Sequence, residues 1–155
     1  MTSLRIGLIS DTHGLLRPQA LAALQGCDHI LHAGDIGKPE ILDALRQLAP
    51  LTAVRGNNDQ EPWARSIGEI EELWLGKTGI YLVHDQADIP ADLGERGFAA
   101  VITGHSHKPL ITQRAGLLHV NPGSAGPRRF KLPVSVGFLL IGNGEVKAEL
   151  RELDI

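Results

Sequence analysis

The sequence has little cysteine and no long apolar segment. Cys27 is the single cysteine among 155 residues, which excludes an internal disulfide and favours a reducing compartment. No apolar run approaches the roughly 18–20 residues that span a bilayer. The short apolar run near the N-terminus ends in Ser10, Asp11, Thr12 and His13, unlike a signal peptide. We therefore expect a cytoplasmic protein with no membrane segment.

Aromatic side chains and positive charge are also scarce. Phe, Trp and Tyr make up 4% of the residues, which leaves few rings on which the bases of a single strand could stack. Lys and Arg number 15 against 18 Asp and Glu, a formal net charge of -3. No basic excess is therefore available to neutralise a phosphate backbone. Both deficits argue against a binder of long nucleic acids.

The rest of the composition is that of one globular domain. Hydrophobic residues make up 43% and charged residues 21%, close to globular averages, and the length suits a single core. The chain has no repeat and no low-complexity tract. We therefore expect a single mixed α/β domain over residues 1–155.

In the first half of the chain, short apolar runs alternate with helical patterns. Strands are predicted at residues 5–10, 29–33 and 51–54, and helices at 18–25 and from Pro39 to Pro50. Strands that alternate with helices are typical of βαβ units and a parallel sheet.

The second half is dominated by hairpin patterns. Its predicted strands are, in chain order, 69–75, 79–83, 98–103, 110–113, 117–120, 134–141 and 145–150, with a short helix at 92–96. Asn143 and Gly144 suit a tight type I′ turn between the last two strands. We therefore expect the later strands to be antiparallel.

Polar clusters follow five of the apolar runs. They are Asp11-Thr12-His13, Gly34-Asp35, Gly56-Asn57-Asn58-Asp59, Val83-His84 and Gly104-His105-Ser106-His107. Because the carboxyl ends of strands in open α/β sheets face the ligand crevice, these clusters can converge there. Residues two apart in an extended chain point the same way, so each Asp-x-His or His-x-His pair can aim both side chains into one site. The glycines before the clusters allow sharp bends.

Each cluster alone has a simpler interpretation. Gly-Asp or Gly-Asn after a strand is usually a turn whose side chain bonds nearby backbone, and we assign His29, His32 and His119 to structural roles. The joint pattern favours a metal site, because four of the seven histidines, two aspartates and an asparagine share one structural context. Nitrogen and oxygen donors without a thiolate suit Mn, Fe, Zn, Co or Ni. Seven donors are too many for one ion and fit two ions that share a carboxylate.

In this order, Asp-x-His, Gly-Asp, Gly-Asn-x-Asp, a strand-end His and Gly-His-x-His resemble the calcineurin-like metallophosphoesterases. The chain length, the run Asn121-Pro122-Gly123-Ser124 and the pair Pro127-Arg128 narrow the resemblance to the small phosphodiesterases of the YfcE group. The retromer subunit of vacuolar sorting is related to that group. The resemblance implies a four-layer α-β-β-α sandwich, in which two mixed β-sheets are flanked by helices. It also implies a binuclear metal-dependent phosphodiesterase.

The resemblance further implies which residues hold each ion. The first ion would be held by Asp11, His13, Asp35 and His107. The second would be held by Asp35, Asn57, His84 and His105, with Asp35 as the bridge. The family uses two divalent ions, often manganese, and a metal-bridging hydroxide as nucleophile; Zn, Fe, Ni, Co and Mg are the alternatives here. Two dications outweigh two aspartates in charge, so the site should attract a phosphate anion.

Two residues depart from the family pattern. Asp85 stands where the family commonly has Gly, and it either faces away from the metals or adds a carboxylate beside their ligands. Asn58 stands where the small phosphodiesterases usually have Cys and larger relatives have His. Its amide can bind a phosphate oxygen but cannot supply a proton. Together with Asn57 and Asn58, Asp59 completes the catalytic group that the resemblance implies, and its expected part is to orient the ligands.

The substrate contacts and partners are less defined. Arg128 either contacts phosphate alongside Asn58 or anchors its loop, and the sequence does not place Arg55 or Arg129. We expect a small phosphodiester as substrate and, by analogy, a homodimer. Two alternatives stay open: a non-catalytic protein-interaction scaffold of the same fold, and a phosphomonoesterase or nuclease. The intact set of seven ligand positions favours the enzyme over the scaffold.

Overall fold

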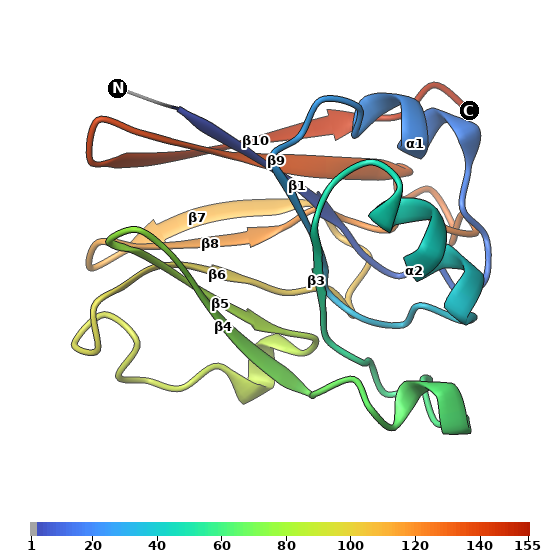
Figure 1. The fold of residues 1–155 in the computed structure, drawn as a ribbon, viewed down its shortest axis with the longest axis horizontal. Coiled ribbons are helices and arrows are strands. Elements are labelled where there is room, and N and C mark those ends of the chain that lie inside the picture. The colour runs from blue at the N-terminus through green and yellow to red at the C-terminus, as the bar shows by residue number, and fades with distance from the viewer. Residues whose placement is uncertain (1–2) are drawn as a thin grey trace.

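The computed structural model of the protein describes residues 3–155, which form two five-stranded sheets with few helices (Figure 1). The strands are β1 Leu4–Ile9, β2 His29–His32, β3 Leu51–Ala53, β4 Ile70–Leu75, β5 Thr78–Val83, β6 Phe98–Ile102, β7 Leu110–Arg114, β8 Leu117–Asn121, β9 Ser135–Gly142 and β10 Glu145–Glu152. The helices are α1 Pro18–Ala23 and α2 Pro39–Arg46, with short 3-10 helices η1 Pro62–Ala64 and η2 Gln86–Asp88.

The first sheet has the strand order β10-β9-β1-β2-β3 and confirms the predicted βαβ units. β1, β2 and β3 run parallel, while β9 and β10 are antiparallel. Asn143 and Gly144 turn between β9 and β10 with φ values of 53° and 75°. A type I′ turn requires positive φ at both central residues, so the predicted hairpin is confirmed.

The second sheet, of order β4-β5-β6-β8-β7, corrects the expectation that the later strands are antiparallel. The hairpins β4–β5 and β7–β8 are antiparallel, but β5, β6 and β8 run parallel to one another. A hairpin pattern identifies which strands are neighbours along the chain. It carries no information on which strand of each hairpin pairs with β6. As a result, three carboxyl ends of this sheet also lie at one edge.

The predicted helix at 92–96 is wrong. This segment forms turns, in which the Arg96 N–H donates to the Asp92 carbonyl at 3.0 Å and the Gly97 N–H donates to Gly94 at 3.1 Å. Gly94 falls inside the segment and Gly97 has a φ of 89°, and glycine disfavours a helix interior. Over the outer face of the second sheet, the described residues 84–97 contain only the short η2 helix.

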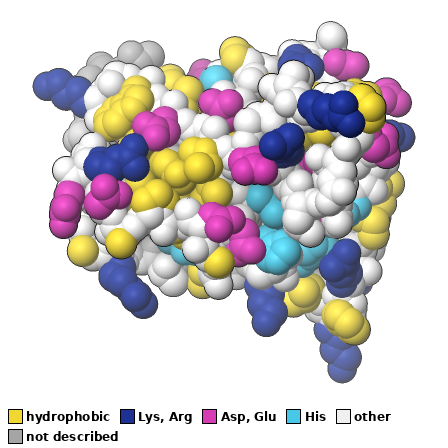
Figure 2. Space-filling view, turned by 90° about the horizontal axis from the view of Figure 1, so that it is seen from below, with side chains coloured by type: hydrophobic (Ala, Val, Ile, Leu, Met, Phe, Trp, Pro, Cys, Tyr) yellow, Lys and Arg dark blue, Asp and Glu magenta, His cyan; other side chains and the backbone are white. Residues whose placement is uncertain are grey.

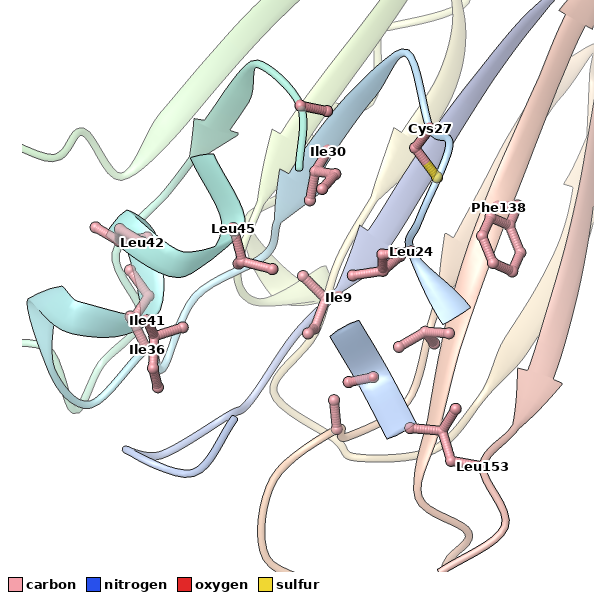
Figure 3. Packing of buried hydrophobic residues seen from close by; sticks show 14 of the residues in the cluster. Ile9, Leu24, Cys27, Ile30, Ile36, Ile41, Leu42, Leu45, Phe138 and Leu153 are labelled. Carbon is pink, nitrogen blue, oxygen red and sulfur yellow. The ribbon is translucent and has the colours of Figure 1, made fainter. Parts of the chain in front are cut away.

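Apolar side chains fill the space between the sheets and the space under the helices. Ile6 and Leu8 of β1 are fully buried against strands of the second sheet. On the other face of the first sheet, Ile41 and Leu45 of α2 pack beside Ile9 (Figure 3). This packing fixes the two sheets against each other, and polar loops follow the carboxyl ends of their parallel strands. Within residues 3–155, no helix is long and apolar enough to cross a membrane.

Candidate metal centre

The loops that follow β1, β2, β3, β5 and β6 bring the seven predicted ligand residues together. Two groups of three have candidate ligand atoms within 4.8 Å of one another: Asp11, His13 and His107, and Asp35, His84 and His105. Asn57 joins the second group, since its Oδ1 lies 3.0 Å from His84 Nε2 and 3.2 Å from His105 Nδ1. The predicted division of the residues into two sets therefore matches their placement.

The first group has an unsatisfied carboxylate oxygen at its centre. Asp11 Oδ1 lies 3.5 Å from His107 Nε2 and 3.8 Å from His13 Nε2, and the two ring nitrogens are 3.4 Å apart. Within residues 3–155, Asp11 Oδ1 and His107 Nδ1 are the buried side-chain polar atoms without a hydrogen-bond partner. Because an unpaired buried carboxylate is costly, a cation between these atoms would resolve an otherwise unfavourable arrangement.

The other oxygen of Asp11 fixes the direction of the carboxylate. Oδ2 accepts hydrogen bonds from the Ser10 hydroxyl at 2.7 Å and from the His105 N–H at 3.0 Å. Burial raises the pKa of Asp11, and it lowers the pKa of His107. The imidazole is thereby kept neutral, which is the form that binds metals.

The second group is oriented by a hydrogen bond from the far side of His84. Its Nδ1 donates to the Ala33 carbonyl at 2.7 Å, so the lone pair of the neutral ring is on Nε2. That nitrogen faces His105 Nδ1 at 3.3 Å. A metal-binding histidine typically donates its other N–H to a carbonyl or carboxylate in this way.

Asp35 lies between the two groups. Its Oδ2 is 3.3 Å from His84 Nε2 in one group and 3.7 Å from His13 Nε2 in the other. Burial alone would raise the pKa of Asp35, but hydrogen bonds with the His84 side chain and the Asn58 N–H outweigh it and lower this pKa to about 2. A charged carboxylate that touches both groups can bridge two cations.

An unusual backbone conformation presents these side chains. Eight non-glycine residues within 3–155 have positive φ, and five of them are predicted ligands: Asp11, His13, Asp35, His105 and His107, at 47° to 71°. The paired residues therefore converge through left-handed turns and not, as expected, through extended chain. Left-handed backbone is uncommon outside glycine and clusters at functional sites.

Sharp bends were expected at the three glycines before the clusters, Gly34, Gly56 and Gly104, but only one of them has the backbone conformation that favours glycine. Gly34 has a φ of 104° and does bend the chain, but φ is not positive at Gly56 or Gly104. A Cβ at Gly56 would collide with the Asp35 carboxylate, 2.8 Å from its Cγ. A Cβ at Gly104 would lie 2.8 Å from Asp11 Oδ2. These two glycines let neighbouring loops approach the carboxylates closely.

Asp59 and Asn58 both reach the loop that carries Asp35. The Asp59 carboxylate accepts N–H groups from Ile36 at 3.0 Å, Gly37 at 3.1 Å and Gly56 at 2.9 Å, so it joins two loops and does not face the ligand groups. Asn58 donates its backbone N–H to Asp35 Oδ1 at 2.9 Å, and its Nδ2 is 3.4 Å from Oδ2. Asp59 thus fixes the two loops that carry Asp35 and Asn57, while the Asn58 amide lies beside the Asp35 carboxylate.

Three further residues that the sequence left undecided, Asp85, Arg128 and Arg55, can now be described by their contacts. Asp85 does not face away, since its Oδ2 lies 3.8 Å from His105 Nε2. Arg128 Nε donates to the Leu132 carbonyl at 3.3 Å, a contact that favours the role of loop anchor. Arg55 pairs with Glu69 at 3.2 Å in a pocket beside the centre.

The structural histidines were predicted correctly. His29, His32 and His119 each bond a threonine hydroxyl, at 2.8 to 3.0 Å, and none of them belongs to either candidate ligand group. Ser10 was missed by the sequence interpretation, although its hydroxyl fixes Asp11. Its place directly before Asp-x-His was the available signal.

The sequence is similar to known proteins along nearly the whole chain. The family model of the calcineurin-like phosphoesterase superfamily domain matches residues 4–144. The chain belongs to that superfamily. A protein named "Probable metallophosphoesterase" from Methanothermobacter thermautotrophicus is 36% identical over 162 residues, with 94% of this chain and 90% of the relative covered. Phosphodiesterase YfcE of Escherichia coli is 28% identical, with 88% and 87% covered.

Solved structures of similar fold include a protein that is not named as a phosphoesterase. Vps29 of Entamoeba histolytica, solved in complex with Zn²⁺, is 25% identical and has a TM-score of 0.73 over 97% of this chain and 100% of its own. The calcineurin-like fold expected from the sequence motifs is therefore confirmed, together with the two mixed sheets.

Proposed function

We propose that this calcineurin-like phosphoesterase is a phosphodiesterase that hydrolyses small phosphodiesters with two divalent metal ions. Manganese is the metal we propose first, and zinc, iron, nickel, cobalt and magnesium are the alternatives. The observation that carries the proposal is the position of Asp35 Oδ2, 3.3 Å from a nitrogen of one donor group and 3.7 Å from a nitrogen of the other. The name of the YfcE relative supports the diester as substrate class.

The donor sets fit two cations. Asp11, His13, His107 and Asp35 would hold one ion, and Asp35, Asn57, His84 and His105 would hold the other. The unpaired, buried Oδ1 of Asp11 supports this fit. When bound, the two ions supply a nucleophile near neutral pH and offset the charge that develops on the phosphoryl group.

The reaction is the hydrolysis of one ester bond. The oxygen of water forms a bond to phosphorus, one P–O ester bond breaks, and the leaving oxygen takes up a proton, so a diester and water give a monoester and an alcohol. This chain positions the reacting groups through hydrogen bonds of its own. Asp59 joins the two loops that carry Asp35 and Asn57, and Ser10 holds Asp11. In this proposal the Asn58 amide donates to a phosphate oxygen, which its position beside Asp35 supports.

Metal-free protein provides the first test. Calorimetric titration with Mn²⁺ should give two bound ions per chain. Activity absent in chelator should return with Mn²⁺ on bis(p-nitrophenyl) phosphate more strongly than on p-nitrophenyl phosphate. The five alternative metals are compared in the same assay. Two bound ions without turnover of either ester would favour the non-catalytic scaffold, and faster turnover of the monoester would favour a phosphomonoesterase.

Asp35→Asn tests the bridge directly. Because one carboxylate oxygen faces both donor groups, loss of its charge should weaken both ion sites and reduce turnover more than any other conservative ligand change. His84→Gln should mainly weaken the second site. Calorimetry on both variants gives the number of bound ions. An Asp35→Asn protein that kept two tightly bound ions and near-normal turnover would contradict the bridging role.

A further inference from the structure

Two pockets of opposite charge flank the candidate metal centre. One pocket, of about 490 Å³, borders Asn57 and His84 and carries the carboxylates of Glu69, Asp85 and Asp88. Arg55 is its one cationic residue and is already paired with Glu69. Figure 2 shows histidines gathered on one face, with acidic side chains directly to one side of them and Lys or Arg side chains on the other.

The second pocket is basic. It has a volume of about 690 Å³, borders His105 and His107, and carries the side chains of Lys108, Arg129 and Lys131. Within the described residues, none of these three cations forms an ion pair with a carboxylate. Three cationic residues without a carboxylate partner around one hollow can attract an anion to the side of the predicted ligands.

An exposed aromatic ring lies in the same pocket. Phe130 is 94% exposed, the highest value among the exposed large hydrophobic residues, in a chain with only three phenylalanines. It occupies the turn closed by the Leu132 N–H and the Arg129 carbonyl at 3.1 Å, and its φ of 54° is left-handed. A bulky residue held in that conformation and left in solvent is a marker of function. A ring beside cations is a platform on which a base can stack.

We propose that the substrate is a short nucleotide diester with a further phosphate on one arm, such as a 5′-phosphorylated dinucleotide. This inference rests on the proposed phosphodiesterase. The internal diester lies over the metal centre, the terminal phosphate contacts Arg129 and Lys131, and a base stacks on Phe130. The acidic pocket repels a second anion, so the charged arm has one direction in which to bind. The formal net charge of -3 is in keeping with a short substrate and not with a long strand.

The test compares two substrates that differ by one phosphate, the dithymidine dinucleotide with and without a 5′-phosphate, on the manganese-loaded enzyme. The ratio of their kcat/KM values should be about ten or more in favour of the phosphorylated form, the effect of one charge-assisted hydrogen bond. Arg129→Gln and Lys131→Gln should each reduce this ratio several-fold. Phe130→Ala should reduce turnover of both dinucleotides. Lys77→Gln, in the exposed turn between β4 and β5, is the matched control and should keep the wild-type ratio.

A binding measurement separates this inference from the proposed function. Thymidine 3′,5′-bisphosphate should bind the metal-free protein in calorimetry, and Arg129→Gln should weaken it about tenfold. If bis(p-nitrophenyl) phosphate is hydrolysed but the substrate ratio is near one and the bisphosphate does not bind, the inference is overturned and the phosphodiesterase stands. If no diester is hydrolysed with any ion, the proposed function fails, and the calorimetry alone decides whether the basic pocket binds a nucleotide phosphate.

Discussion

At the scale of single residues, the site has many metal donors and no evident proton donor. Asn58 occupies the position beside the bridging carboxylate, 3.4 Å from Asp35 Oδ2, where relatives in the family carry a side chain that can release a proton. The histidines outside the predicted ligand set, His29, His32 and His119, are each bonded to a threonine hydroxyl. We therefore expect the leaving oxygen to depart without a proton from Asn58 or from these three histidines.

Asn58→His should make the enzyme less dependent on the leaving group. General-acid assistance is typically worth about 10²–10⁴-fold in rate and matters most for a poor leaving oxygen. A nitrophenolate departs without a proton, whereas an alkoxide does not. We expect wild-type rates to fall steeply as the pKa of the leaving alcohol rises, and the variant to gain far more on alkyl diesters than on aryl diesters.

Rates across a series of aryl and alkyl diesters, measured for both proteins, provide the readout. Asn58→Gln is the control, since it keeps an amide and should keep the steep dependence. A flat dependence in the wild type would mean that another group protonates the leaving oxygen, and Asn58 would then only orient phosphate.

The candidate ligand residues and the supporting Asp59 could be predicted from the sequence, but the contacts of Ser10 and Asp85 could not. The spacing of Asp11, His13, His105 and His107 is local and repeats a known motif. The contact of Asp85 with His105 and the bond from Ser10 to Asp11 depend on how loops from different strands meet. No pattern along one segment encodes such contacts.

At the scale of the elements, local sequence patterns also explain which strands were predicted correctly and which strand directions were not. The hairpins β4–β5, β7–β8 and β9–β10 were predictable, because turn residues and alternating strands are local signals. The parallel pairing of β5, β6 and β8 joins segments that are distant in sequence, and no local turn signal encodes it, so the second half of the sequence suggested more antiparallel pairing than the structure has. The segment 92–96 has a helix-like composition, but Gly94 within it and Gly97 directly after it favour turns.

The close approach of loops at Gly56 gives a prediction at this scale. Gly56→Ala should leave the protein folded and reduce turnover about 10²-fold, because the new Cβ meets the Asp35 carboxylate and displaces it by roughly 1 Å. Calorimetry should find weakened metal binding in parallel. Circular dichroism and thermal unfolding verify the fold.

Gly94→Ala is the matched control. Its Cβ would meet only the Ala115 carbonyl, at 3.9 Å, and its φ is not in the left-handed range. Full metal binding and turnover are expected for Gly94→Ala. If Gly56→Ala behaved in the same way, the loop after β3 would have to be loose enough to accommodate the methyl group.

At the scale of the whole molecule, His32 contributes to stability through hydrogen bonds with the loops that carry Asp11 and Asp35. This residue ends β2, is fully buried, and accepts the Gly34 N–H on Nδ1 at 3.0 Å. The Thr12 hydroxyl donates to the Ile36 carbonyl at 2.8 Å, so His32 Nε2 donates to Thr12 at 3.0 Å. Both nitrogens are used in the neutral ring. A second proton on Nδ1 would face the Gly34 N–H.

The metal-free protein should therefore lose stability in acid. Burial lowers the pKa of His32 from 6.5 to about 3. Below pH 6.5 the unfolded chain takes up a proton that the folded chain excludes, so the free energy of unfolding falls by roughly 1.4 kcal/mol per pH unit from this group until about pH 3. His84, whose pKa is raised despite its burial by its hydrogen bond with Asp35, acts in the opposite direction and over higher pH.

His32→Gln isolates the contribution of this histidine from the others. Glutamine keeps a donor and an acceptor but does not titrate, so the variant should be less stable at pH 7.5 and should lose less stability between pH 6 and pH 4 than the wild type. Urea unfolding at several pH values, in chelator, gives both slopes, and their difference removes the shared contribution of His84 and the aspartates. Parallel slopes for the two proteins would mean that His32 is protonated in the fold as readily as in the unfolded chain, and that the hydrogen bonds linking β2 to the loops of Asp11 and Asp35 do not require its neutral ring.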